Sequence, residues 1–277
     1  MHAHWKKMLA IIILLAVSSA IAAFLVYERV PPPPPPQAES EVGRETPSSM
    51  GGLRALYYDS LAREYPNETL EETVVSLLEG AGYRVDVYVG ANATLGPLED
   101  IGEYDLVIIR AHGAYNGDPR SGRPLGSYVY TGLYMREAEA LYGEKWVSHA
   151  IRAGLIAPAV IPPPGWNGSL SGLPEYVAVS PRFFEEYLGR FQRHPIIIVD
   201  GCYGLNDERL ADIFLSHGAR AFIAWKGDVT LDWSDTILAR TVKLLVKGYE
   251  PSGIPELLGG SSVDPATGGR LLVVTGK

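Results

Sequence analysis

Cysteine is almost absent: Cys202 is the only one in 277 residues, so no internal disulfide can form. The formal net charge of −8 gives no basic surface, and binding to nucleic acid is not expected. Neither HExxH nor a cysteine-rich spacing occurs, so no metal site is predicted. Phosphate-loop and GxGxxG patterns are missing as well, so the sequence predicts no cofactor.

One long apolar run is present near the N-terminus. Residues 8–27 carry no charge, and twenty residues suffice for a helix to cross a bilayer. Lys6 and Lys7 precede the run and favour the cytoplasmic side, which leaves everything after Tyr27 outside. We therefore predict a cytoplasmic N-terminus at 1–7 and a transmembrane anchor at 8–27. The alternative is a signal peptide cleaved after Ala22, which would secrete the same domain.

Residues 28–52 form a predicted linker that holds the folded part away from the membrane. It begins with six consecutive prolines at 31–36, which adopt a semi-rigid polyproline II helix. Residues 53–277 then form one predicted domain. Three glycosylation sequons in it agree with an extracytoplasmic location: Asn67, Asn92 and Asn167.

The domain alternates between strand and helix patterns, which predicts a three-layer α/β sandwich with a mostly parallel sheet. Expected strands are 53–58, 84–89 (an edge strand), 105–111, 196–199, 220–225 and 271–275, and expected helices include 70–80, 136–153 and 234–247. The interval 114–180 is less regular and rich in Gly, Pro and Tyr. We expect it to be a long insertion that forms a lid or substrate wall, with Tyr115, Tyr128, Tyr130 and Trp166 as wall candidates; ordinary packing under the loop is the alternative.

Two buried-strand runs each end beside a reactive side chain. Residues 196–199 are followed by Asp200, Gly201 and Cys202, and residues 105–111 by His112 and Gly113. Carboxyl ends of parallel strands share one edge of a sheet, where open α/β folds bind ligands. A histidine there can lower the pKa of the thiol and protonate a leaving group. The alternative is a small buried cysteine and a structural histidine.

The blocks VIIRAHG and IIIVDGCYG resemble those of the caspase-like cysteine peptidases, the clan of caspases, legumain, gingipains, clostripain and separase. This resemblance implies a flavodoxin-like sheet, His112 as general base and acid, and Cys202 as nucleophile. It also implies that the amides of Gly113 and Cys202 form the oxyanion hole. The interval between the two blocks is longer than in the simplest members, so the substrate pocket is not carried over.

Pocket candidates near the expected strand ends are Asp200, Asp228, Trp225 and Tyr115, with Asp232 close by. A carboxylate lining the pocket would favour a basic residue before the scissile bond; the alternative is that each of these carboxylates is a solvated loop residue.

Taken together, these features of the sequence predict a membrane-anchored, extracytoplasmic cysteine endopeptidase that cleaves proteins or peptides. The competing hypothesis is a catalytically inactive caspase-like domain for binding or scaffolding; the oligomeric state stays open.

The topology can be tested directly. Protease added to intact cells should digest the folded domain, because Lys6 and Lys7 keep only the short N-terminus inside. Immunoblotting of the C-terminal region before and after cell lysis measures this. Digestion that begins only after lysis would reverse the predicted orientation.

Overall fold

The computed structural model describes residues 52–117, 124–162 and 167–276. The predicted tail, the predicted anchor and all of the linker except Gly52 lie outside these ranges. Within them, no helix combines the length and apolar character needed to cross a membrane.

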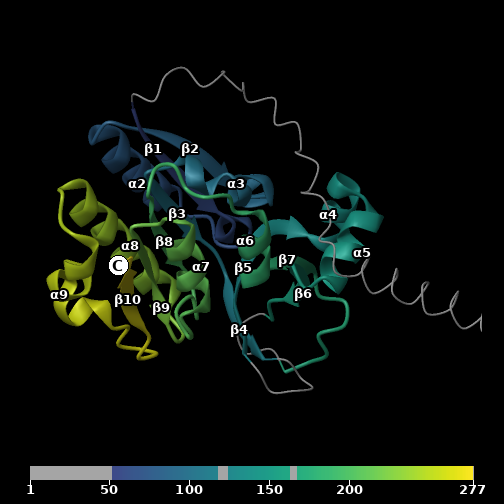
Figure 1. Ribbon diagram of the computed structural model, residues 1–277. Coiled ribbons are helices and arrows are strands. Elements are labelled where there is room, and N and C mark those ends of the chain that lie inside the picture. The colour runs from purple at the N-terminus through teal and green to yellow at the C-terminus, as the bar shows by residue number, and fades with distance from the viewer. Residues whose placement is uncertain (1–51, 118–123, 163–166, 277) are drawn as a thin grey trace, which may run out of the picture.

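The centre of the molecule is a six-stranded sheet, here called sheet A (Figure 1). Its order is β10-β9-β8-β3-β1-β2, with β10 antiparallel to β9 and the other neighbours parallel. The strands are β1 (Leu53–Asp59), β2 (Tyr83–Val89), β3 (Leu106–Arg110), β8 (Ile196–Asp200), β9 (Ala221–Lys226) and β10 (Arg270–Thr275). The mostly parallel α/β sheet is confirmed, and β2 is an edge strand as its alternating pattern predicted.

Helices cover both faces of sheet A. One face packs against α2 (Glu68–Gly80), α8 (Leu231–Val246) and α9 (Ile254–Leu258), and the other against α3 (Gly96–Glu99), α6 (Pro181–Tyr187) and α7 (Arg209–His217). Short 3-10 helices occur at η1 (Leu61–Arg63), η2 (Gly90–Asn92), η3 (Ile101–Glu103), η4 (Pro251–Gly253) and η5 (Gly259–Ser262). Since β3 and β8 are covered on both sides, their β-branched runs contain no polar alternation.

Helix α2 shows how local sequence sets an element next to the site. Asn67 caps it, because the side-chain carbonyl accepts a hydrogen bond from the amide of Leu70 at 3.1 Å. Leu70, Val74 and Leu78 recur every four residues and are buried against β1 and α8. The capping side chain thereby fixes the start of the helix beside the carboxyl end of β1.

The interval 114–180 is more regular than we expected. It forms a four-stranded antiparallel sheet, sheet B, in the order β4-β5-β7-β6. Its elements are β4 (Gly113–Gly117), β5 (Pro124–Tyr134), α4 (Met135–Tyr142), α5 (Glu144–Arg152), β6 (Ile156–Val160) and β7 (Glu175–Val179). The single helix predicted over 136–153 is wrong, because Gly143 with φ of +88° separates α4 from α5. Gly and Pro within these strands hid the pattern, and Pro158 is accommodated because β6 lies at the sheet edge.

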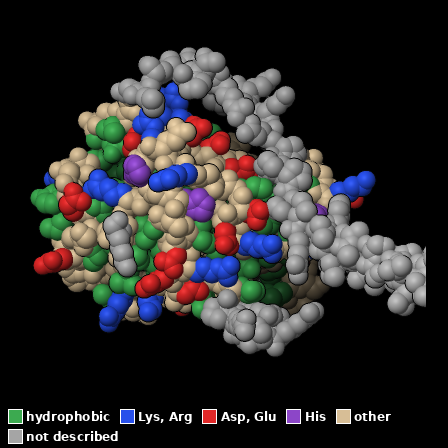
Figure 2. Space-filling model, in the orientation of Figure 1, with side chains coloured by type: hydrophobic (Ala, Val, Ile, Leu, Met, Phe, Trp, Pro, Cys, Tyr) green, Lys and Arg blue, Asp and Glu red, His purple; other side chains and the backbone are tan. Residues whose placement is uncertain are grey.

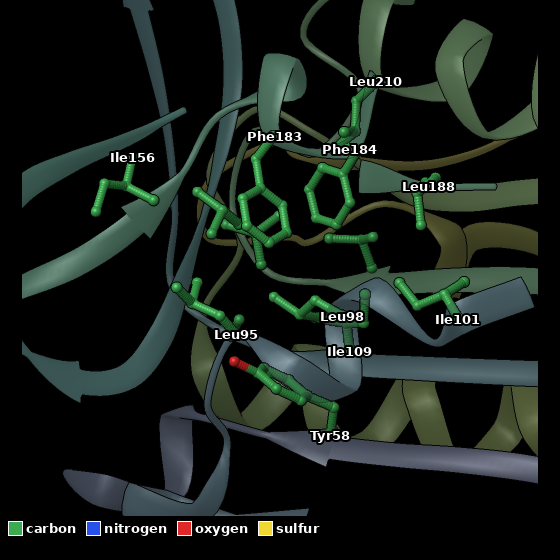
Figure 3. Packing of buried hydrophobic residues seen from close by; sticks show 14 of the residues in the cluster. Tyr58, Leu95, Leu98, Ile101, Ile109, Ile156, Phe183, Phe184, Leu188 and Leu210 are labelled. Carbon is green, nitrogen blue, oxygen red and sulfur yellow. The ribbon is translucent and has the colours of Figure 1, made fainter. Parts of the chain in front are cut away.

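Sheets A and B share one hydrophobic core. Figure 3 shows Phe183 and Phe184 of α6 between Leu210 on one side and Leu98 on the other. The two rings are 5.6 Å apart and edge to face, a favourable geometry for aromatic pairs. Both side chains are fully buried, so α6 joins the inner face of sheet B to sheet A.

The buried strand β8 provides a stability test. Ile197→Asp places an unpaired charge in a fully buried position and should cost several kcal/mol of unfolding free energy. Ile151→Asp, at a position on α5 that is 37% exposed, is the matched control and should change it little. Denaturant unfolding of the two purified variants measures both effects. Equal stability of the two variants would show that β8 is not part of the core.

Candidate active site

The structure brings His112 and Cys202 to one edge of sheet A, on neighbouring strands. Arg110 and Asp200 are paired in the register of β3 and β8, and the amide of Ala111 donates to the carbonyl of Asp200 at 3.0 Å. His112 and Cys202 each follow that pair by two residues. They therefore lie at adjacent carboxyl strand ends, where open α/β sheets bind ligands. Among the described residues no hydrogen bond joins the imidazole to the thiol.

Glycines allow the two strand ends to approach closely. A Cβ on Gly113 would lie 2.0 Å from the carbonyl oxygen of Cys202, and one on Gly201 would lie 2.1 Å from that of Ala111. Only glycine fits at either position. The amides of Gly113 and Cys202, the expected oxyanion donors, thus belong to segments in main-chain contact, and no described backbone carbonyl accepts from Cys202 N–H.

The turn after Cys202 is held in a strained conformation. Tyr203 has φ of +64°, which is uncommon for a residue with a side chain. Its amide donates to the carbonyl of Gly227 at 2.9 Å, and its carbonyl accepts from the hydroxyl of Ser127. These bonds to β5 and to the segment after β9 fix the orientation of the thiol-bearing turn.

A buried ion cluster lies at the strand ends that lead to His112 and Cys202. The Arg110 side chain is fully buried; its Nη1 lies 3.0 Å from both carboxylate oxygens of Asp59, and its Nε and Nη2 donate to Asp235 at 2.7 and 2.9 Å. Nη1 also donates to the carbonyl of Tyr65 at 3.3 Å. Burial raises the pKa of Asp59, although Arg110 opposes the shift. Sequence reasoning missed this cluster; the local signals were a charged residue at the end of each of two buried strands.

Asp200 is buried beside that cluster. Its Oδ1 accepts from Ser234 Oγ at 2.6 Å and from Trp225 Nε1 at 3.1 Å, while Oδ2 has no partner among the described residues. Burial raises the pKa of Asp200 to about 6, and the charge of Asp235 adds to the rise. Asp200 and Trp225 were predicted as pocket residues, but both are buried and bonded to each other, so they lie beneath the site.

The imidazole of His112 has a carboxylate partner that the sequence did not reveal. His112 Nε2 lies 3.1 Å from Glu64 Oε2, and the rings of Tyr65 and Tyr130 are centred 5.9 and 6.1 Å away. Burial lowers the pKa of His112; Glu64 opposes this, whereas Arg110 contributes to it. The resting imidazole is therefore favoured in its neutral form at pH 7.

The thiol of Cys202 contacts the main chain of the β9–α8 loop. Sγ accepts from the amide of Val229 at 3.4 Å and lies 3.6 Å from the carbonyl oxygen of the same residue. Burial raises the pKa of Cys202, and the charges of Asp228, Asp200 and Asp264 raise it further. The pKa of the thiol is thus shifted upward and not downward in this conformation, because the sulfur is buried and its charged neighbours are carboxylates.

The remaining predicted wall residues are spread around the site. Tyr115 is half-buried and hydrogen-bonds Asp207, and Asp228 is exposed and hydrogen-bonds Tyr203. Tyr128 and Tyr130 pack in a tyrosine-rich cluster on the outer face of sheet B, with Tyr176 and Ala178. Asp232 is exposed in the first turn of α8, and Trp166 lies outside the described residues.

The three predicted glycosylation sites differ in accessibility. Asn92 and Asn167 are exposed, whereas the side-chain nitrogen of Asn67 donates to Asp235 at 2.8 Å and is not free to carry a glycan.

Figure 2 shows acidic and basic side chains interspersed on the face in view. Over the described ranges, no group of three or more His, Cys, Asp or Glu side chains is placed to hold a metal ion.

Comparison with known proteins gives no identification. No protein-family model matches the chain. No curated protein matches it significantly.

The raised pKa of Asp200 predicts a specific pH dependence of stability. An aspartate whose folded pKa is about 6 rather than 3.8 binds a proton more tightly when folded, so unfolding free energy should fall as pH rises from 4 to 6. A shift of about two pKa units corresponds to roughly 3 kcal/mol. Asp200→Asn should remove this component. Denaturant unfolding of wild type and variant at pH 4 and pH 7 measures it; identical pH profiles would show that Asp200 does not titrate in this range.

Proposed function

We propose that the chain is a membrane-anchored, extracytoplasmic cysteine endopeptidase, with Cys202 as nucleophile and His112 as general base and acid. The observation that carries this is the placement of a thiol and an imidazole at adjacent carboxyl strand ends of one parallel sheet. The resemblance of VIIRAHG and IIIVDGCYG to the caspase-like peptidases supports the same assignment.

The order of sheet A also supports a caspase-like, flavodoxin-like fold. Counting only the parallel strands, it is second, first, third, fourth and fifth, and the connections reverse direction between β1 and β3. Folds with this order bind ligands outside the carboxyl ends of those two strands. His112 follows β3 and Glu64 follows β1, so the imidazole and its carboxylate partner flank this position.

In the proposed reaction, Cys202 Sγ attacks the carbonyl carbon of the scissile peptide bond while His112 takes the thiol proton. The negative charge that develops on the carbonyl oxygen is stabilised by the amides of Gly113 and Cys202. The imidazolium then protonates the leaving nitrogen as the carbon–nitrogen bond breaks and a thioester forms. Water, deprotonated by His112, attacks the thioester carbon, and the thiolate leaves and is protonated.

The resting state shapes this mechanism. Because burial, with nearby carboxylates, raises the pKa of Cys202 and burial lowers that of His112, the resting pair is a neutral thiol and a neutral imidazole. Proton transfer must then accompany the attack, as in general-base catalysis. The thiol must also leave Val229, whose amide and carbonyl both contact it, before it reaches a substrate.

The contact with Val229 also supports a second candidate function. A neutral thiol bonded to the main chain suits a domain that binds or scaffolds partners without catalysis. In that case Cys202 stabilises the β9–α8 loop, and its reactivity resembles that of an ordinary buried thiol. Peptidase assays on variants separate the two functions.

We expect Cys202→Ala to abolish hydrolysis of fluorogenic peptides, because the nucleophile is removed. His112→Ala should slow it by about 10²–10⁴-fold, the range of general acid–base catalysis. His217→Ala is the matched control: this histidine lies on α7 and bonds the carbonyl of Ile213, so the rate should not change. A panel with Arg, Lys, Asp or Asn before the cleaved bond provides the measurement. Hydrolysis that survives Cys202→Ala would exclude the proposed mechanism.

A further inference from the structure

The carboxylate that contacts His112 comes from a loop the sequence did not associate with the site. Glu64 follows β1 and η1, and its Oε2 lies 3.1 Å from His112 Nε2. We propose that Glu64 is a positioning residue that fixes the ring orientation of His112 and stabilises its protonated form during the reaction. The inference rests on the proposed function and adds a third side chain to it.

The main chain of Glu64 is fixed on both sides. Its amide donates to the carbonyl of Leu61 at 3.1 Å, and the amide of Tyr65 donates to the same carbonyl at 2.9 Å. Arg63, the preceding residue, forms a bidentate pair with Glu137 at 2.8 and 2.7 Å. Bidentate arginine–carboxylate pairs restrict geometry strongly. Glu137 lies on α4, and Arg63 Nη1 also donates to the carbonyl of Gly132 on β5 at 2.6 Å, so the loop that carries Glu64 is tied to both α4 and sheet B.

The side chain of Glu64 is held as well. The side chain of Tyr176, on β7, lies beside the carboxylate and interacts with it electrostatically. The hydroxyl of Tyr176 lies 3.3 Å from the hydroxyl of Tyr134, over whose ring the Arg63 guanidinium lies at 3.8 Å. Burial and the neighbouring carboxylate raise the pKa of Tyr176, so its hydroxyl keeps its proton and remains a donor. Glu64 therefore contacts His112 from a defined direction.

This contact determines which nitrogen of His112 is available. A carboxylate beside Nε2 favours the tautomer with the proton on Nε2, which leaves Nδ1 as the acceptor for a thiol proton. Tyr65 and Tyr130 flank the ring and limit its rotation. Burial and the positive charge of Arg110 both lower the pKa of His112, and the negative charge of Glu64 opposes this shift. Asp59 and Asp235 pair with Arg110 and neutralise much of its charge. Among the residues that the structure describes, Glu64 is the carboxylate in contact with the ring.

The test uses Glu64→Gln in the full chain, with the fluorogenic peptide that wild type cleaves best. Gln keeps the shape and removes the charge. We expect a roughly 10- to 100-fold lower kcat with little change in KM, part of the contribution of acid–base catalysis. The acid limb of the pH–rate profile should move to lower pH, because the pKa of His112 falls. Glu64→Asp should restore part of the rate, and Glu68→Gln, at an exposed position in the first turn of α2, should behave as wild type.

An NMR titration of His112, assigned by comparison with His112→Ala, decides the contact without any substrate. A lower His112 pKa in Glu64→Gln supports the inference. An unchanged His112 pKa, or a raised KM with unchanged kcat, overturns it. If no activity depends on Cys202 but the titration still shifts, the proposed function fails while the coupling of Glu64 to His112 stands. If Cys202-dependent activity is present and neither rate nor titration changes, the inference fails alone.

Discussion

The buried ion cluster of Arg110 with Asp59 and Asp235 is the interaction on which the site depends. It joins the ends of β1 and β3 to α8, and Arg110 also binds the carbonyl of Tyr65 in the loop that carries Glu64. Removing one partner of such a cluster leaves a buried charge and typically costs about 3–5 kcal/mol. His112 lies two residues beyond Arg110, so its position depends on this ion cluster.

The charge balance around this cluster also sets the chemistry. Three buried aspartates, at positions 59, 200 and 235, face one arginine, so the region carries excess negative charge. Burial and the charge of Asp235 raise the pKa of Asp200 to about 6, and its Oδ2 has no partner among the described residues. Burial, together with the nearby carboxylates, raises the pKa of Cys202 and keeps the thiol protonated. The site is therefore built for proton transfer during a reaction, whereas a thiolate would need a cation near sulfur.

Sheet B changes how the site is assembled. It begins at Gly113, directly after His112, and returns Tyr130 and Tyr176 to the same region. An insertion that folds as a sheet holds these rings more rigidly than an irregular lid would, because main-chain ladders fix both strands. The histidine environment thus combines a loop of sheet A with two strands of sheet B. The thiol environment, by contrast, comes from β8 and the loop after β9.

The sequence by itself determined the buried strands β3 and β8, and hence that His112 and Cys202 follow neighbouring carboxyl ends, because continuous β-branched runs and terminal glycines are local signals. Sheet B was not predictable from its Gly- and Pro-rich strands, whose pairing depends on residues up to about fifty positions apart. Tertiary structure alone decided the partners of Arg110, the contact of Glu64 with His112 and the direction in which the pKa of Cys202 is shifted. Arg110 and Asp235 are 125 residues apart, and a pKa depends on which charges the fold gathers around a group rather than on its neighbours in sequence.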